Sequence, residues 1–392
     1  MAEQEVAEQY SAQHQLGWCS HTPPNETLDL DGNLAQTPEA ELDPRAPAER
    51  RYDHPDVTRL RQHLHDHSGI KDLEICQPDE LDRIVEIFHR DGFVVVSDLL
   101  TPEQVTQWNT ACERVMQDIL AYPGQGQRKY LTESLRLPHR YSYGTSSASR
   151  ELLHEPVWAQ MIDLPTTTPI LQRLFASKDY CVLGSGGDFC LPGAVEYQVL
   201  HVDHRDQHKL YADRLAQAEQ LGVRLDRDER GELTPRTTQL ALIKTSPIIT
   251  INFMMTQLTT QNGPIRHIPG THAFPHRAPN QFKEPEWMRL STLVGAPAGS
   301  GVFRDSRAWH GATPNLSQEV RAMPNVEYAA EWVEADAFKQ TMPRTVYNQL
   351  GEYAQHLSRR VVAAEGEWPA GAGKMHPVAA ERTRLQQEPQ HS

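Results

Sequence analysis

Val195-Glu-Tyr-Gln-Val-Leu200 is one of several short runs of β-branched and aromatic residues that lie between about residues 178 and 335. The comparable runs cover residues 180–183, 248–255, 301–303 and 320–328, and Gly, Pro and Asn residues separate them. Short strands divided by such turn signals are typical of a β-sandwich or a barrel. This part of the chain therefore predicts a mainly β core.

Helical patterns flank this core. Residues 79–90 carry apolar side chains at helical spacing, and Gly92 follows as a stop signal. Thr101-Pro-Glu-Gln104 has the form of a capping box with Pro at the first helical position, and it predicts a second helix that ends before Pro123. A last helix is expected from about residue 343 to 361. The fold class is thus α+β, mainly β with flanking helices.

The composition separates one folded domain from polar ends. Of the 392 residues 38% are hydrophobic, enough for a large core. Residues 1–77 read as a polar N-terminal arm, 78–362 as the domain, and 363–392 as a tail. A charged segment at about 204–240 interrupts the β-rich series, and we expect it to be a partly helical insertion over the mouth of the barrel.

Charge and hydropathy narrow the function classes. The net charge of −14 argues against nucleic acid as a partner, because an acidic chain repels phosphate backbones. The sequence predicts a cytoplasmic protein: its acidic N-terminus does not resemble a secretory signal, no apolar run approaches the roughly 20 residues of a membrane span, and the five cysteines are unclustered. The oligomeric state cannot be read from the sequence.

A His-x-Asp pair on a strand directs an imidazole and a carboxylate to the same side, because side chains at i and i+2 share a face. Two histidines and one carboxylate bind ferrous iron and leave positions open for a keto acid and O₂. The sequence holds four such pairs: His54/Asp56, His89/Asp91, His201/Asp203 and His204/Asp206. We favour His201/Asp203, which closes the β-rich run, over His204/Asp206 in more charged sequence.

The second half of the site is predicted around His310, which follows an apolar strand and precedes the turn Gly-Ala-Thr-Pro-Asn315. Arg321 lies eleven residues later, on the next expected strand. A guanidinium there can bind the distal carboxylate of a keto acid through two hydrogen bonds. A surface arginine on an edge strand is the alternative interpretation.

Gln198 and Asn252 lie on expected strands and can point into the barrel. An amide satisfied within the core is the favoured interpretation of each, and a contact with the keto acid is the alternative. His267, His272 and His276 are better read as loop residues near the site than as metal ligands.

These stretches, in this order, resemble the phytanoyl-CoA dioxygenase family of Fe(II)- and 2-oxoglutarate-dependent oxygenases. The resemblance rests on residues 91–104, His201-Val-Asp203, residues 262–272, Trp309-His310 and Arg321. It implies a double-stranded β-helix, a distorted jelly roll related to the cupins. It also implies that His201, Asp203 and His310 bind Fe(II) and that Arg321 binds 2-oxoglutarate.

The implied activity is hydroxylation of a small-molecule metabolite, with O₂ consumed and with succinate and CO₂ released. Halogenases related to this family have Gly or Ala at the position of Asp203, so a carboxylate there favours hydroxylation, although desaturation and ring chemistry stay open. We expect a role in secondary metabolism, and the sequence does not name the substrate.

Two other functions stay open from the sequence. A cupin-like metal enzyme would use a similar histidine-rich barrel without 2-oxoglutarate and would not need Arg321. An inactive member of the family could serve as a binding subunit, and its failure to retain iron would reveal it. Modification of proteins is less favoured, because relatives that demethylate histones commonly use a lysine for 2-oxoglutarate.

Overall fold

The structure is a computed structural model, and its described residues begin at 55 and end at 369. They are residues 55, 57–59, 61–62, 73–120, 139–143, 151–195, 197–198, 200–204, 206, 209–273, 278 and 295–369. The predicted arm up to residue 54 and the tail from residue 370 onward lie outside them.

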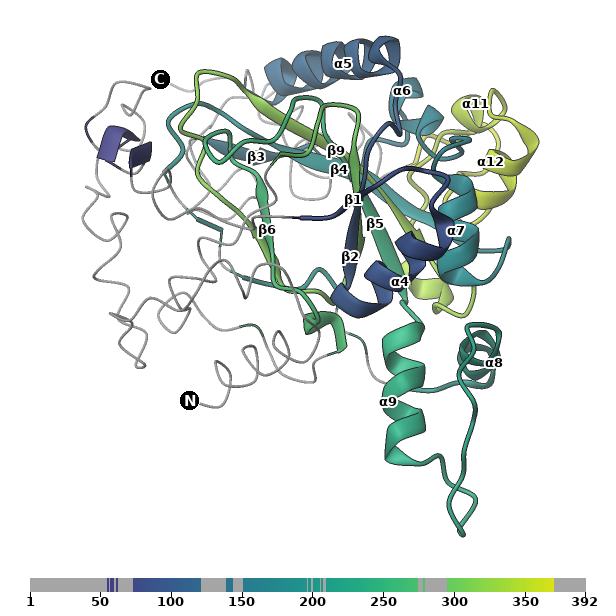
Figure 1. Ribbon diagram of the computed structural model, residues 1–392. Coiled ribbons are helices and arrows are strands. Elements are labelled where there is room, and N and C mark those ends of the chain that lie inside the picture. The colour runs from purple at the N-terminus through teal and green to yellow at the C-terminus, as the bar shows by residue number, and fades with distance from the viewer. Residues whose placement is uncertain are drawn as a thin grey trace, which may run out of the picture.

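A seven-stranded sheet forms the centre of the fold (Figure 1), in the order β1-β2-β7-β5-β9-β4-β3. All its neighbouring strands are antiparallel except β1 and β2, which are parallel. Because β1 belongs to this sheet, the sheet begins before the boundary predicted at residue 78. The strands are β1 (Ile75–Cys76), β2 (Phe93–Val96), β3 (Arg140–Ser142), β4 (Cys181–Cys190), β5 (Ile248–Phe253), β7 (Gly301–Asp305) and β9 (Arg321–Ala329).

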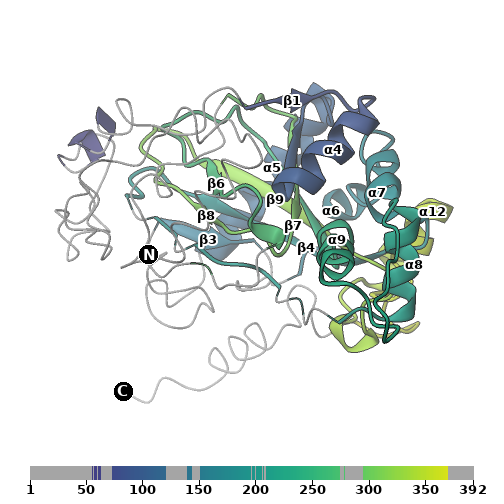
Figure 2. The ribbon, with the colours of Figure 1, turned by 60° about the horizontal axis from the view of Figure 1, so that its bottom comes forward.

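Helices cover one face of this sheet (Figures 1 and 2). Side chains at alternate positions of a strand point to opposite faces, so Ile249, Ile251 and Phe253 of β5 join the large apolar core beneath the helices. Val326 and Tyr328 of β9 join the same core. The helices are α4 (Leu81–Asp91), α5 (Pro102–Leu120), α6 (Pro156–Gln160), α7 (Thr168–Phe175), α11 (Arg344–Tyr347) and α12 (Glu352–Leu357).

The other face of the sheet packs against a smaller one, made of β6 (Ile265–His267) and β8 (His310–Ala312). Bridges from Ala194 to Asn315 and from His201 to His310 place the 194–201 segment along the second side of β8. A second core, which includes Val302 and Met323 of the large sheet and Ile265 and Trp309 of the small one, fills part of the space between them. Two facing sheets connected in this way form a double-stranded β-helix, which confirms the predicted fold class.

The two predicted N-terminal helices are confirmed with their boundary signals. α4 ends at Gly92, whose φ of 81° is left-handed, and the Gly92 N–H donates to the carbonyl of Phe88. The N–H of Thr101 donates to Gln104 Oε1 at 2.9 Å, and the N–H of Gln104 donates to Thr101 Oγ1 at 3.2 Å. These reciprocal bonds are the capping box that opens α5.

The single helix predicted from about residue 343 to 361 is wrong, because the chain turns between α11 and α12 at Gly351. The side chain of Gln355 donates to the carbonyls of Tyr347 and Leu350. It thereby bonds carbonyl groups that a continuous helix would have paired with its own backbone.

The segment predicted as an insertion contains α8 (Ala212–Gln220) and the start of α9 (Pro235–Lys244). Both helices project away from the body of the molecule in Figure 1. Inside this segment the fully buried Arg214 bonds Asp206 and Thr245 and lies over the Trp332 ring. None of the described residues of α8 or α9 lines the cavity between the sheets. The described part of the segment is therefore partly helical, and neither helix contributes to the cavity wall.

Gly187 allows β4 and β9 to approach closely beside this cavity. Its φ is +118°, and a Cβ atom there would lie 2.1 Å from the backbone oxygen of Met323. Only a residue without a side chain fits this contact. The close approach fixes the position of the neighbouring Asp188 against β9.

Candidate metal centre

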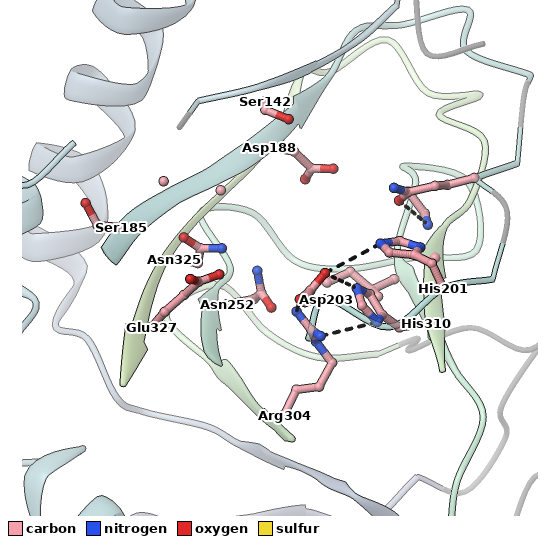
Figure 3. A pocket seen from close by; sticks show the side chains of 16 residues that line it. Ser142, Ser185, Asp188, His201, Asp203, Asn252, Arg304, His310, Asn325 and Glu327 are labelled. Atoms are coloured by element: carbon pink, nitrogen blue, oxygen red, sulfur yellow. Dashed lines mark hydrogen bonds and ion pairs between the residues drawn. The ribbon is translucent and has the colours of Figure 1, made fainter. Parts of the chain in front are cut away.

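A cavity of about 240 Å³ opens between the two sheets, and its wall is mostly polar (Figure 3). It is lined by Ser142, Ser185, Gly186, Gly187, Asp188, Gln198, His201, Asp203, Asn252, Ile265, Arg304, His310, Gly311, Ala312, Asn325 and Glu327. Both sheets contribute to the lining, so residues that are far apart in the sequence face the same space.

His201, Asp203 and His310 meet on one side of this cavity. The Nε2 atoms of His201 and His310 lie 3.6 and 3.4 Å from the same oxygen, Asp203 Oδ1. The three ligand atoms lie within 4.8 Å of one another. Metal ligands at about 2.1 Å and at right angles would be about 3 Å apart, so a small inward shift of these side chains would fit them to one ion.

Backbone pairing holds the two histidines in place. The N–H of His201 donates to the carbonyl of His310 at 3.0 Å, and the N–H of His310 donates back at 3.1 Å. Because β8 starts at His310, the bridge brings its ring to within 4.3 Å of the His201 ring, measured between centroids. Asp203 follows two residues after His201, and its N–H donates to Ser306.

The protonation states suit a metal ligand set. Burial, with Arg304 nearby, lowers the pKa of His310 to about 4, so its ring is neutral at pH 7. Its Nδ1 lies 3.0 Å from the carbonyl oxygen of Ala308, and when Nδ1 donates there Nε2 keeps its lone pair. Burial alone would raise the pKa of Asp203, but Arg304 and His310 hold it well below its usual range.

Arg304 is a residue of this site that the sequence reasoning missed. It lies on β7 and is almost fully buried, and its Nη2 donates to Asp203 Oδ2 at 2.7 Å. Asp203 Oδ1 is thereby left to face the two histidines. The signal was weak: Arg304 is an arginine in a short apolar strand, and strand alternation would have placed it on the same face as Val302, toward the barrel interior.

Arg321 is fully buried at the start of β9 and does not line the cavity. Its Nη1 donates to the carboxylate of Asp188, which does line the cavity. Burial works against its charge, but Asp188 raises the pKa of Arg321, which stays protonated. Arg321 is thus not a surface residue, and Asp188 lies between its guanidinium and the cavity.

The two amides on the cavity wall differ. Gln198 accepts a hydrogen bond from the N–H of Ala312 at 3.2 Å, as expected of an amide satisfied within the core. Asn252 is 7% exposed, and its Oδ1 accepts no hydrogen bond from the part of the chain that the structure describes. This oxygen is itself buried, so the amide nitrogen is the polar atom of Asn252 that can face the cavity.

The rival His-x-Asp pairs have other partners or lie outside the described residues. Asp206 forms ion pairs with Arg214 and Arg307, away from the cavity lining. In the second pair Asp91 pairs with Arg90. His54 and Asp56 are outside the described residues.

Two of the three histidines that the sequence suggested as loop residues lie in the described part of the chain. His267 is not in a loop, because it pairs with His310 across β6 and β8 and stacks between the rings of Phe93 and His310. His272 lies in a short 3₁₀ turn and is buried, whereas His276 lies outside the described residues.

No helix in the described part of the chain is both long enough and apolar enough to span a membrane.

Comparisons with known proteins give one family and several solved structures. The model of the family described as "Phytanoyl-CoA dioxygenase (PhyH)" matches residues 88–323. The α-ketoglutarate-dependent epimerase SnoN from nogalamycin biosynthesis is 15% identical, with a TM-score of 0.42, over 64% of this chain and 83% of its own. The carbocyclase SnoK from the same biosynthesis is 17% identical, with a TM-score of 0.42, over 65% and 87%.

HygX from Streptomyces hygroscopicus, solved with nickel, 2-oxoglutarate and hygromycin B, is 14% identical. Its TM-score is 0.41, and the match covers 64% of this chain and 87% of HygX. At these identities and TM-scores the three structures support no inference about the site. The family match, in contrast, spans more than half of the chain and includes His201, Asp203 and His310.

Proposed function

Because this chain belongs to the phytanoyl-CoA dioxygenase family, we propose that it is an Fe(II)- and 2-oxoglutarate-dependent dioxygenase that hydroxylates a small molecule. One observation carries the proposal. Two imidazole nitrogens and one carboxylate oxygen converge at the wall of a polar cavity. This donor set fits ferrous iron and leaves the cavity side of the ion open.

His201, Asp203 and His310 are the proposed ligands. When bound, iron and 2-oxoglutarate supply the oxidising chemistry: O₂ is consumed, the keto acid becomes succinate and CO₂, and the substrate gains a hydroxyl group. The protein binds and orients these groups and limits their contact with water. Arg304 keeps Asp203 ionised and turned so that one oxygen faces the metal site.

Arg321 is the proposed partner of the distal carboxylate of 2-oxoglutarate. Its Nε and Nη2 are buried and have no hydrogen-bond acceptor among the described residues, so the guanidinium has donors to spare. The keto acid must displace or join Asp188 to reach them. Asn252 is a further proposed contact through its amide Nδ2. Gln198 could contribute its amide nitrogen only, because its oxygen bonds Ala312.

The size of the cavity favours a small metabolite as the substrate. A space of about 240 Å³ between two sheets accommodates a compact molecule together with the co-substrate rather than a folded protein surface. We expect a role in secondary metabolism.

The test is spectroscopic. Anaerobic protein with Fe(II) and 2-oxoglutarate should develop a weak visible charge-transfer band. His310→Ala should lose the band, whereas His356→Ala, which removes an exposed histidine on α12, should keep it. An unchanged band in His310→Ala would refute the ligand assignment. Succinate release in a screen of metabolites would then identify the substrate.

A second function is favoured by one observation, the contact between Arg321 and Asp188. A cupin-like metal enzyme that does not use 2-oxoglutarate would have no need to free Arg321 from this contact. Such an enzyme would bind iron at the same three residues but would show neither the charge-transfer band nor succinate release. Loss of stoichiometric iron would instead indicate an inactive binding subunit.

A further inference from the structure

The carboxylates on the cavity wall do not all have a positively charged partner. Asp203 forms an ion pair with Arg304, and Asp188 forms one with Arg321. Glu327 on β9 also lines the cavity, but no described residue donates a hydrogen bond to it or forms an ion pair with it. A carboxylate in such a place is costly unless a cation or hydrogen-bond donor reaches it.

Iron and the co-substrate do not change this imbalance. The two positive charges of a ferrous ion cancel the two negative charges of 2-oxoglutarate. With both bound, two guanidiniums still face three carboxylates, and the carboxylate in excess is Glu327. Burial in the cavity, with Asp203 nearby, raises the pKa of Glu327 to about 7. When Glu327 is ionised, the cavity is therefore short of one positive charge beside it.

A second polar side chain lies beside this carboxylate. Asn252 on β5 is in register with Asn325 on β9, and Glu327 is two residues further along the same face of β9. This diagonal relation across two strands is within reach of long side chains. Asn252 is nine-tenths buried, and its Oδ1 is closed off as well, so its amide nitrogen is the polar atom that can face the cavity. Figure 3 shows the side chains of Asn252, Asn325 and Glu327 grouped at one end of the cavity.

The chemistry of these groups selects one kind of ligand. An ionised carboxylate is a pure acceptor. An ammonium group has three N–H donors, no acceptor and one positive charge, so it gives Glu327 both a donor and the missing charge. A neutral hydroxyl offers one donor, and a substrate carboxylate would be repelled.

We propose that Glu327 binds an ammonium group of the substrate, so that the substrate is a small primary amine. This inference rests on the proposed function for the identity of the metal and the keto acid. It adds the class of substrate and the residue that distinguishes that class. Glu327 orients the amine, and the bond to be oxidised is a C–H bond of the same molecule that lies toward His201, Asp203 and His310.

The test compares two probes that differ in one group, cyclohexylamine and cyclohexanol. Binding to Zn(II)-loaded protein with 2-oxoglutarate is measured by calorimetry at pH 8, because zinc occupies the site without reacting with oxygen. We expect the amine to bind at least about tenfold more tightly than the alcohol, as one charge-assisted hydrogen bond predicts. In Glu327→Gln the affinity for cyclohexylamine should fall to that for cyclohexanol.

Two control variants separate charge from fold. Glu331→Gln makes the same change at an exposed position just beyond β9 and should keep the preference for the amine. Glu327→Asp keeps the charge and should restore part of the preference. Thermal unfolding of each variant checks that the fold is intact.

The outcomes distinguish this inference from the proposed function. Equal binding of amine and alcohol to the parent protein, or a preference for the amine that survives in Glu327→Gln, would overturn it. If the zinc-loaded protein does not bind 2-oxoglutarate, the proposed function fails instead. The same two probes with zinc alone then still test Glu327.

Discussion

Asp188→Asn should make the protein bind 2-oxoglutarate more tightly. In the structure the Asp188 carboxylate accepts a hydrogen bond from Arg321, the residue proposed to hold the distal carboxylate of the keto acid. Arg321 is fully buried, and the Asp188 side chain is 19% exposed at the cavity wall. An incoming carboxylate therefore meets a carboxylate of the protein beside its own binding partner.

The magnitude follows from the charges. Two carboxylates about 4 Å apart repel each other by about 4 kcal/mol at an effective dielectric constant of 20, and partial exposure of Asp188 reduces this value. A hydrogen bond to a charged group contributes about 1.5–3 kcal/mol. The substitution of an amide for the carboxylate keeps the shape and removes the charge, so we expect a gain of about 1.5–3 kcal/mol. The dissociation constant of 2-oxoglutarate should fall roughly ten- to a hundredfold.

The assay is an anaerobic titration of 2-oxoglutarate into Fe(II)-loaded protein, followed by the charge-transfer band. Arg321→Met should shift the titration in the opposite direction, and Asp226→Asn, at an exposed position between α8 and α9, should not change it. Binding to Asp188→Asn that equals or is weaker than that of the parent protein would show that Asp188 does not compete with the keto acid.

Three further predictions concern stability. Burial lowers the pKa of His89 to about 3, so the folded protein keeps this ring neutral while the unfolded chain binds a proton below pH 6.5. The free energy of unfolding should therefore decrease as the pH is lowered from 6.5 to 3. Measured by urea unfolding, His89→Gln should lose on the order of 2–3 kcal/mol less between pH 7 and pH 4.5 than the parent protein does. The same pH dependence in both proteins would contradict this. Ile251→Ala, in the core under the helices, should lower the free energy of unfolding by about 2–5 kcal/mol, and a loss below about 1 kcal/mol would show that the site collapses around the change. Gly187→Ala should cost at least about 2 kcal/mol because its Cβ meets a backbone oxygen of β9, whereas Gly222→Ala, also at positive φ but in open space, should cost about 1 kcal/mol in the same assay.

The His-x-Asp pair was found in the sequence because extended backbone places side chains at i and i+2 on one face. In the described residues before it the predicted strand is not formed, and His201 is held by an isolated bridge to His310 instead. The choice between Asp203 and Asp206 rested on the apolar run before His201. In the structure Asp206 forms ion pairs with Arg214 and Arg307, whereas Asp203 lies beside His201 and His310. Arg304 carried no such local signal. Its role depends on β7 crossing beside Asp203, a contact between residues a hundred positions apart.

The sequence by itself determined the mainly β core and the helices α4 and α5 through apolar patterns and boundary residues. Motif spacing and the family resemblance supplied the residues proposed as metal ligands. Apolar periodicity and helix caps depend on residues within a few positions of one another, so they can be recognised in the sequence alone. Only the tertiary structure decided that Asp188 covers Arg321, that Arg304 is bonded to Asp203, and that Glu327 has no partner among the described residues. These contacts depend on the register and the order of the strands in the sheet. Packing between distant parts of the chain sets both, and no short stretch of sequence encodes them.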